Sequence, residues 1–414
     1  MSKKLRFLIT LMFVVAVVGF VFTVPANAKV EGDTIIFGAA VSFTGKYSTN
    51  GKHTKNGYEL AVKRINEMGG IFVDGKTYKI KIKYYDDEST PARAGQLADR
   101  LIKQDKIKFI LGPYGSGPTK GIAPITEKYK IPMVEGNGAS RSLFNKGYKY
   151  LFAVLSTSEQ YLAESINLLA EQFKKAGKDP SSAKVAIAVE NDPFSMDIRA
   201  GVLDDARRWG MKVIIDDKLP KELTDMTATL TKVKALKPDI LVVSGHSKGA
   251  ALAVRQTSQM KVDVPMLAIT HCEAADVIGK FGGSANYTLC ATQWAETMTY
   301  RDKWFGFAGE YAELFKEIYG YMPPYQAAES TAAVLVYIDA LERARSFDTE
   351  KVRDALAATN LLTFYGWIDF DDTGKNIAKP MVLRQIQKGK LIPVAPSRFA
   401  AGELIYPKPK WRDR

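Results

Sequence analysis

Residues 108–121 read KFILGPYGSGPTKG, an apolar strand that runs directly into a glycine-rich loop. From Gly112 the spacing G-x-x-x-x-G-P-T differs by one residue from G-x-x-x-x-G-K-[ST], the loop that cradles nucleotide phosphates. Pro118 replaces the lysine of that motif, which removes an ammonium group and one backbone N–H. Backbone N–H groups and serine hydroxyls can still hold another anion at a strand end. We therefore interpret the loop as a carboxylate cradle centred on Ser116.

Strands and helices alternate on both sides of this loop. Short β-rich runs are expected as strands at residues 34–42, 78–86, 108–112, 131–136, 183–190, 211–217, 238–245 and 264–270. Helical patterns follow many of them, at residues 51–68, 91–102, 196–209, 226–236 and 248–260. Such alternation predicts parallel sheets with helices on both faces. Because the strands outnumber those of one ordinary sheet, we expect an α/β fold with two doubly wound lobes.

The last third of the chain has a different pattern. Long helices are expected over residues 311–319 and 326–345. Strand and hairpin signals return in FYGWIDFDDTGKN (364–376) and MVLRQIQKGKLIPV (381–394). Since no low-complexity linker occurs, we expect short crossings between the lobes in place of one flexible tether.

The first residues have the features of an export signal. Three basic residues precede an apolar run over 7–24, and small residues at Ala26 and Ala28 follow. This pattern predicts a secretory signal peptide over residues 1–28, cleaved after Ala28, and the alternative is an uncleaved membrane anchor. The mature chain is then expected in the periplasm, and its length suggests two or three domains.

Charge and cysteine content narrow the class further. The formal net charge is +13, but the lysines are scattered along the chain, which favours a solvated basic surface over nucleic-acid binding. The two cysteines, Cys272 and Cys290, lie on or beside expected strands. In an oxidising compartment they could form a disulfide, or they could remain two small apolar side chains, and the sequence leaves both possibilities open.

Ligands of open parallel sheets bind beyond the carboxyl ends of the strands, so the residues there are the candidate site. In the first lobe these ends carry glycines and hydroxyls, which suit an anion. In the second lobe they carry an aromatic ring, two imidazoles and an acid, which suit the rest of a small molecule. The chemistry-bearing candidates are Tyr114, Ser116, Ala139, Ser140, Phe194, His246, His271 and Glu273.

Several motifs together resemble a known family. They are VSFTGKYSTNGKHTKNGYELAVKRINEMGGI (41–71), YYDDESTPARAGQLADRLI (84–102), FILGPYGSGPTKGIAPI (109–125), IPMVEGNGAS (131–140) and FYGWIDFDDTGKN (364–376). Their order and spacing resemble the type I periplasmic solute-binding proteins of the branched-chain amino acid (Leu/Ile/Val) family. The resemblance covers nearly the whole mature sequence.

The resemblance implies discontinuous lobes. The chain would cross between them three times, near Ala153, Trp294 and Gly366. This gives an N-terminal lobe of residues 29–153 plus 295–365 and a C-terminal lobe of residues 154–294 plus 366–414. The resemblance also implies closure by hinge bending and docking of the closed complex on a membrane ABC permease.

Site residues follow from the resemblance by position. The groups that hold a ligand carboxylate fall on Ser116, Ala139 and Ser140, and a first-loop contact falls near Asn50. An aromatic contact falls on Phe194 and another aromatic position on His246.

The acid that pairs with an amino acid's ammonium falls on His271, which is a departure from the family pattern. An imidazole is a poor partner for ammonium. Either Glu273 takes this role or the ligand lacks an α-amino group and is an aromatic or hydroxylated carboxylate. His246 and His271 would then donate hydrogen bonds to a distal polar group or to a second negative charge.

The expected function is therefore binding and release by a monomeric transport receptor for a small carboxylate, with no cofactor, metal or nucleic acid. A sensory ligand-binding role is the first alternative. A Ser/His hydrolase would need Ser116 or Ser140 beside His246 or His271, but the sequence has no G-x-S-x-G elbow. Metal capture by His246, His271 and Glu273 is a further alternative, without the tight ligand spacing of a metal motif.

Overall fold

A computed structural model describes residues 29–221 and 223–414, so the expected signal peptide at residues 1–28 lies outside the described residues. The first of two seven-stranded sheets has the order β3-β4-β2-β5-β6-β7, with β1 paired to β2. Its strands are β1 (Val30–Glu31), β2 (Thr34–Val41), β3 (Ile71–Val73), β4 (Lys76–Asp86), β5 (Ile110–Leu111), β6 (Met133–Glu135) and β7 (Leu151–Ala153). From β4 to β7 all neighbours are parallel.

The second sheet has the order β18-β17-β12-β11-β10-β8-β9. Its strands are β8 (Lys184–Glu190), β9 (Lys212–Leu219), β10 (Ile240–Ser244), β11 (Met266–Ile269), β12 (Thr288–Thr292), β17 (Val382–Gln387) and β18 (Lys390–Ala395). The strands from β8 to β12 pair in parallel, and β17 and β18 add an antiparallel edge. Two small antiparallel pairs are separate: β13 (Arg301–Asp302) with β14 (Gly306–Phe307), and β15 (Asn360–Thr363) with β16 (Gly366–Asp369).

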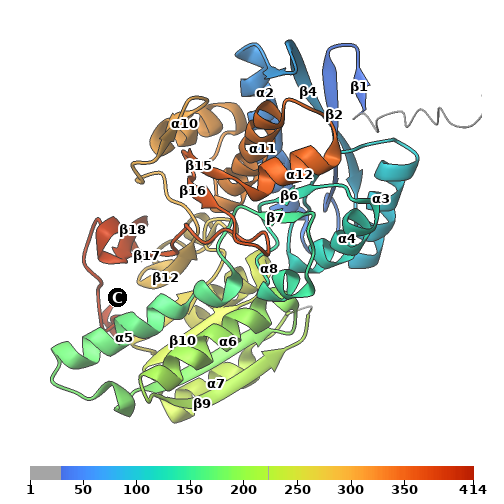
Figure 1. The fold of residues 1–414 in the computed structure, drawn as a ribbon. Coiled ribbons are helices and arrows are strands. Elements are labelled where there is room, and N and C mark those ends of the chain that lie inside the picture. Colours follow the sequence, from blue (N-terminus) through green and yellow to red (C-terminus); the bar gives the residue numbers. More distant parts are fainter. Residues whose placement is uncertain (1–28, 222) are drawn as a thin grey trace, which may run out of the picture.

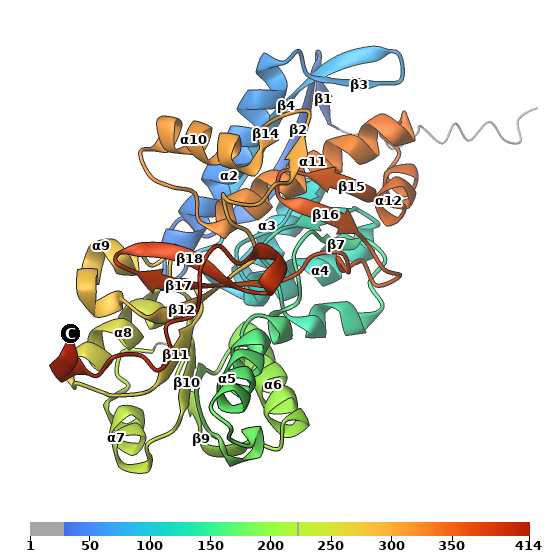
Figure 2. The same cartoon turned by 90° about the vertical axis from the view of Figure 1, so that its left-hand side faces the viewer.

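Helices cover the two sheets and form two lobes (Figures 1 and 2). The helices of the first lobe are α2 (Ser48–Glu67), α3 (Pro91–Lys103), α4 (Ser116–Tyr129), α10 (Ala308–Tyr319), α11 (Tyr325–Ala344) and α12 (Thr349–Ala357). Those of the second lobe are α5 (Ala163–Lys175), α6 (Pro193–Arg208), α7 (Thr227–Leu236), α8 (His246–Gln259) and α9 (Val277–Phe281). Short 3-10 turns are η2 (Arg141–Lys146), η3 (Ser158–Gln160), η4 (Pro180–Ser182), η5 (Gly282–Ala285), η6 (Ser397–Phe399) and η7 (Trp411–Asp413).

This architecture confirms the expected α/β fold with two doubly wound lobes joined by three crossings. After β7 the chain leaves the first sheet for the second, after β12 it returns to α10 and α11, and after β16 it crosses again to β17. Of the described helices, none has a stretch both long and apolar enough to cross a membrane.

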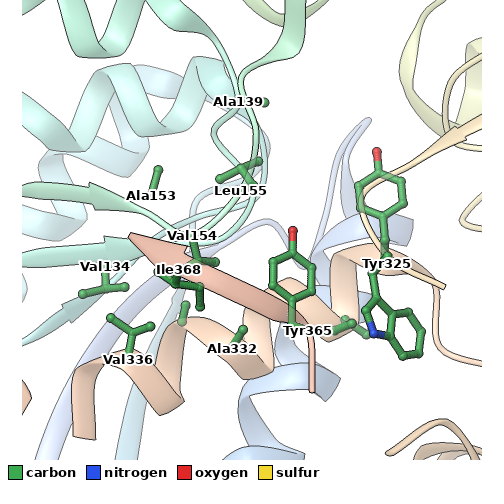
Figure 3. Packing of buried hydrophobic residues seen from close by; sticks show 14 of the residues in the cluster. Val134, Ala139, Ala153, Val154, Leu155, Tyr325, Ala332, Val336, Tyr365 and Ile368 are labelled. Carbon is green, nitrogen blue, oxygen red and sulfur yellow. The ribbon is translucent and has the colours of Figure 1, made fainter. Parts of the chain in front are cut away.

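The three crossing segments are hydrogen-bonded to one another. The Gln293 amide donates to Ser156 O (2.9 Å), and the Ser156 hydroxyl donates to Lys379 O (2.7 Å). Figure 3 shows Val154 next to Ile368 of β16. We propose the lobe boundaries that the sequence suggested, with the third crossing placed near Lys379, because Gly366 begins β16, which pairs with β15 inside the first lobe.

The structure also decides between the two possibilities for the cysteines. Cys272 and Cys290 form a disulfide, with 5.7 Å between their Cα atoms. Both side chains are buried. The bridge joins the loop after β11 to β12, one residue from His271. It therefore fixes the backbone that carries a candidate site residue.

Candidate ligand-binding site

The registers of the parallel strands bring the candidate residues together. Leu111 of β5 is level with Val134 of β6, so the loops that carry Tyr114 and Ala139 leave the first sheet side by side. In the second sheet Val243 is level with Ile269, so the ends of β10 and β11 are neighbours. His246 and His271 follow these two ends, and Asp192 follows β8 on the other side of β10.

Tyr114 of the first lobe reaches both histidines of the second. Its hydroxyl lies 2.9 Å from Nδ1 of His246 and 2.8 Å from Nε2 of His271. Nε2 of His246 lies 3.0 Å from Oδ2 of Asp192. The Phe194 ring is centred 5.3 Å from each imidazole. These five side chains are buried and form one network across the interface between the lobes.

Three members of this network, His271, Asp192 and Tyr114, have shifted pKa values that indicate their protonation states. Burial, with a smaller effect of His246, lowers the pKa of His271 well below its usual value, so this imidazole is neutral at pH 7. Burial alone would raise the pKa of Asp192, but the His246 imidazole and hydrogen bonds from His246 and the Ser195 N–H outweigh it and lower that pKa. Burial also raises the pKa of Tyr114, which keeps its phenol protonated.

Both histidines have an uncommon backbone conformation. Their φ angles are +49° for His246 and +61° for His271, in the left-handed region that side-chain-bearing residues rarely adopt. Such a conformation costs about 1–3 kcal/mol and is concentrated at functional sites. Eleven other side-chain-bearing residues among those described also have a positive φ, so this conformation alone does not distinguish the two histidines.

The residues expected to form the carboxylate cradle also lie together. Ser116 begins α4 directly after Gly115, whose φ is +85°. Its hydroxyl oxygen accepts a hydrogen bond from the Ser140 N–H at 2.9 Å, and the Ala139 carbonyl accepts one from the Ser158 N–H at 2.8 Å. The Ser116 hydroxyl proton and the first N–H groups of a fourteen-residue helix are thus available for an anion.

Ser140 has a further partner that the sequence did not indicate. Its hydroxyl lies 2.6 Å from Oδ2 of Asp197 on α6, in the opposite lobe. A ligand carboxylate would have to compete with Asp197 for this hydroxyl. Ser116 is therefore the better hydroxyl donor of the two.

Asn50 also contacts the opposite lobe: its Oδ1 accepts a hydrogen bond from the Ser247 hydroxyl at 2.7 Å. Close to it, the Lys46 ammonium lies 2.6 Å from Oε1 of Glu190, at the end of β8. Burial raises the pKa of Glu190, whereas the adjacent Lys46 ammonium acts to lower it, and the net shift is upward. Sequence reasoning missed Lys46 and Glu190. Asp192 was recognised as a strand-end residue but was given no role in the site.

Glu273 is not brought into this network. It forms an ion pair with Arg384 of β17, whose guanidinium is buried and also lies 3.2 Å from Glu296. Glu273 therefore compensates a buried cation of the sheet. Its expected role as the partner of a ligand ammonium has no support from this position.

The two chemical alternatives find little support in the geometry. Among the described residues, the hydroxyls of Ser116 and Ser140 bond to Ser140 N, Ser142 and Asp197, and neither imidazole contacts them. The buried groups of Glu190, Asp192 and His246 have atoms within 4.8 Å of one another. However, Glu190 is paired with Lys46, and Asp192 is paired with His246. We assign neither a nucleophile–base pair nor a metal site here.

Some buried polar atoms around the network have no hydrogen-bond partner within residues 29–221 and 223–414. They are Asn137 Oδ1, Ser158 Oγ, His271 Nδ1 and both amide atoms of Gln326. Each belongs to a segment that borders the site: the 136–140 loop, the segment bonded to Ala139, the end of β11, and the start of α11 beside Tyr325. Buried polar atoms are normally paired, so these five are available to a bound polar molecule, although eleven other buried atoms of the described residues also have no partner.

Two α/β lobes whose strand ends meet at a polar interface define a two-lobed ligand-binding protein. The comparison with protein families agrees. A family model described as "Periplasmic binding protein" matches residues 34–390, and the chain belongs to this family.

Individual relatives are distant but extensive. The "Leu/Ile/Val-binding protein homolog 7" of Brucella suis is 22% identical, over 85% of this chain and 89% of the relative. Among solved structures, the branched-chain amino acid transporter substrate-binding protein LivJ of Streptococcus pneumoniae in complex with isoleucine has a TM-score of 0.75 and 23% identity, covering 88% of this chain and 100% of that one. A solute-binding protein of an ABC transporter from Rhodopseudomonas palustris, in complex with 3,4-dihydroxybenzoic acid, has a TM-score of 0.75 and 20% identity, covering 91% and 99%. At these identities the structural matches define the fold.

Proposed function

We propose that this protein is the periplasmic solute receptor of an ABC importer and binds a small carboxylate between its lobes, without catalysing a reaction. The family supports the receptor role, and the basic, apolar start of the sequence supports export. A membrane permease is the partner that this role requires. The observation that carries the proposal is the assembly of Ser116 and the start of α4 opposite the Tyr114–His246–His271 network.

The second lobe favours an aromatic or hydroxylated carboxylate over a simple aliphatic amino acid. Phe194 and Tyr325 lie beside the imidazoles and offer ring faces. The position expected to hold an ammonium carries His271, and Glu273 is engaged by Arg384. The relatives named above include receptors described with either ligand class, so both belong in the test.

The test is a thermal-shift screen of leucine, isoleucine, benzoate and 3,4-dihydroxybenzoate, followed by calorimetric titration of the compound that stabilises most. Ser116→Ala should weaken its binding by about 1.5–3 kcal/mol, because one hydrogen bond to a charged group is lost. Ser182→Ala is the matched control, since Ser182 is an exposed serine of η4. Equal affinities for wild type and Ser116→Ala would overturn the carboxylate cradle.

A further inference from the structure

One ring nitrogen of the Tyr114–His246–His271 network is unpaired among the described residues. His271 Nδ1 has no hydrogen-bond partner among the described residues, although the His271 side chain is buried. The ring lies among the rings of Tyr114, Phe194, His246 and Tyr325, with centroid distances from 5.3 to 6.4 Å. A buried ring nitrogen without a partner costs free energy. Whether this nitrogen donates or accepts a hydrogen bond therefore affects which ligands the site binds.

Whether His271 Nδ1 donates or accepts follows from the hydrogen bonds of the neighbouring residues. The Asp192 carboxylate can only accept, so Nε2 of His246 must donate to it. A neutral His246 then has a bare Nδ1, which accepts the proton of the Tyr114 hydroxyl. The Tyr114 oxygen, having donated its proton, accepts from Nε2–H of His271. A neutral His271 has one proton only, so its Nδ1 is a bare acceptor.

We propose that Asp192, His246 and Tyr114 act as positioning residues that hold His271 in its Nε2–H tautomer, so that Nδ1 selects ligands carrying a hydrogen-bond donor besides their carboxylate. The donor is a hydroxyl, an amide N–H or an ammonium group, so the proposal also replaces the expectation that an imidazole at this position is a poor partner for ammonium. This rests on the proposed function of the interlobe site. It replaces the expectation that both imidazoles donate to a second negative charge, because a bare nitrogen repels an anion.

The network also reverses on protonation of His246. His246 then donates from both nitrogens, Tyr114 donates to Nε2 of His271, and His271 Nδ1 carries the proton and becomes a donor. The charged and titratable groups that face His246 are Asp192, Glu190 with its partner Lys46, His271, Tyr114 and Tyr47. A protonated His246 would therefore shift the preference toward ligands with an acceptor in place of the donor.

Nitrogen-15 NMR of the histidine side chains in the ligand-free protein reads the tautomer directly. The chain has three histidines, and the third, His53 of α2, bonds to Tyr321 and is assigned by His53→Gln. Where the His246 signals report a neutral ring, His271 should show a protonated Nε2 and an unprotonated Nδ1. Tyr114→Phe should abolish that tautomer preference while the His53 signals stay unchanged. A protonated Nδ1 of His271 beside a neutral His246 would overturn the proposal.

Matched ligands test the selectivity. At pH 7.5 4-hydroxybenzoate should bind about tenfold or more tightly than benzoate, and terephthalate, with a second carboxylate, should bind worse than 4-hydroxybenzoate. Leucine against 4-methylpentanoate is the aliphatic pair, with the same expected order. Tighter binding of terephthalate, or equal binding within both pairs, contradicts the selectivity. If none of these carboxylates binds, the proposed function fails, and the NMR result still decides the state of His271.

Discussion

Single buried groups set the chemistry of this molecule. In the first lobe, Glu135 of β6 and Glu329 of α11 are both fully buried and lie near each other. Glu135 accepts hydrogen bonds from the N–H groups of Asn137 and Gly138, in the loop that leads to the carboxylate cradle. Burial raises the pKa of Glu135 to about 7, and the pKa of Glu329 also lies well above its usual value. The loop is thus anchored on a group that titrates near neutral pH.

Glu135 should make stability depend on pH. Its folded-state pKa is raised, so the stability it contributes is complete below pH 4.5 and is lost as pH rises through about 7. Between pH 5 and 7 the loss is about 2 kcal/mol by linkage. Urea unfolding at several pH values should therefore show a steeper decline for wild type than for Glu135→Gln. The exposed Glu171→Gln is the control, expected to keep the wild-type slope, and parallel slopes for all three proteins would refute this effect.

Some residues of the candidate site could be predicted from the sequence, and others could not. Ser116, Ala139, Phe194 and the two histidines were identified because strand ends and a family pattern mark them, and the structure brings them to one interface, although their binding role stays a prediction. Glu273 could not be placed, because its partner Arg384 is far away in the sequence. Lys46 and Glu190 were missed for the same reason: an ion pair between lobes leaves no local pattern.

At the level of elements, the first lobe depends on close helix packing. Helix α2 crosses α11 at Gly57, where an added Cβ would lie 2.2 Å from Ala327 O. Most strands and helices that were given ranges lie within a few residues of the predicted bounds, but α5, α12, β7 and β12 were given no range. Helix α4 was not given a range, because Gly117, Pro118, Gly121 and Pro124 lie inside it, and these residues ordinarily indicate loops.

Gly57→Ala should therefore force α2 and α11 apart. We expect a loss of about 1–3 kcal/mol in the free energy of unfolding, typical of an overpacked core. Gly283→Ala is the matched control, because no neighbouring atom lies within 4 Å of its added Cβ and its φ is not in the left-handed region. Urea denaturation measures both variants, and a Gly57→Ala protein as stable as Gly283→Ala would refute the close contact.

For the whole molecule, the two lobes are linked by contacts of the site itself. Lys46 with Glu190, Asn50 with Ser247, and Tyr114 with the two histidines all join one lobe to the other. The double-lobed architecture followed from the alternation of strands and helices, whereas the three crossings followed only from resemblance, because periodicity says nothing about which sheet a strand joins. We expect the lobes to bend at the three crossing segments, which hydrogen bonds among Ser156, Gln293 and Lys379 join.

The central claim is that a carboxylate binds between the lobes and holds them together. Small-angle X-ray scattering tests it most directly, on wild type and Lys46→Ala, each free and saturated with the compound identified by calorimetry. Lys46→Ala removes a partly buried ion pair between the lobes, so its free form should have a larger radius of gyration than free wild type. Saturating ligand should bring both proteins to the same smaller radius. An unchanged radius of gyration in both proteins, with binding confirmed by calorimetry, would contradict the account.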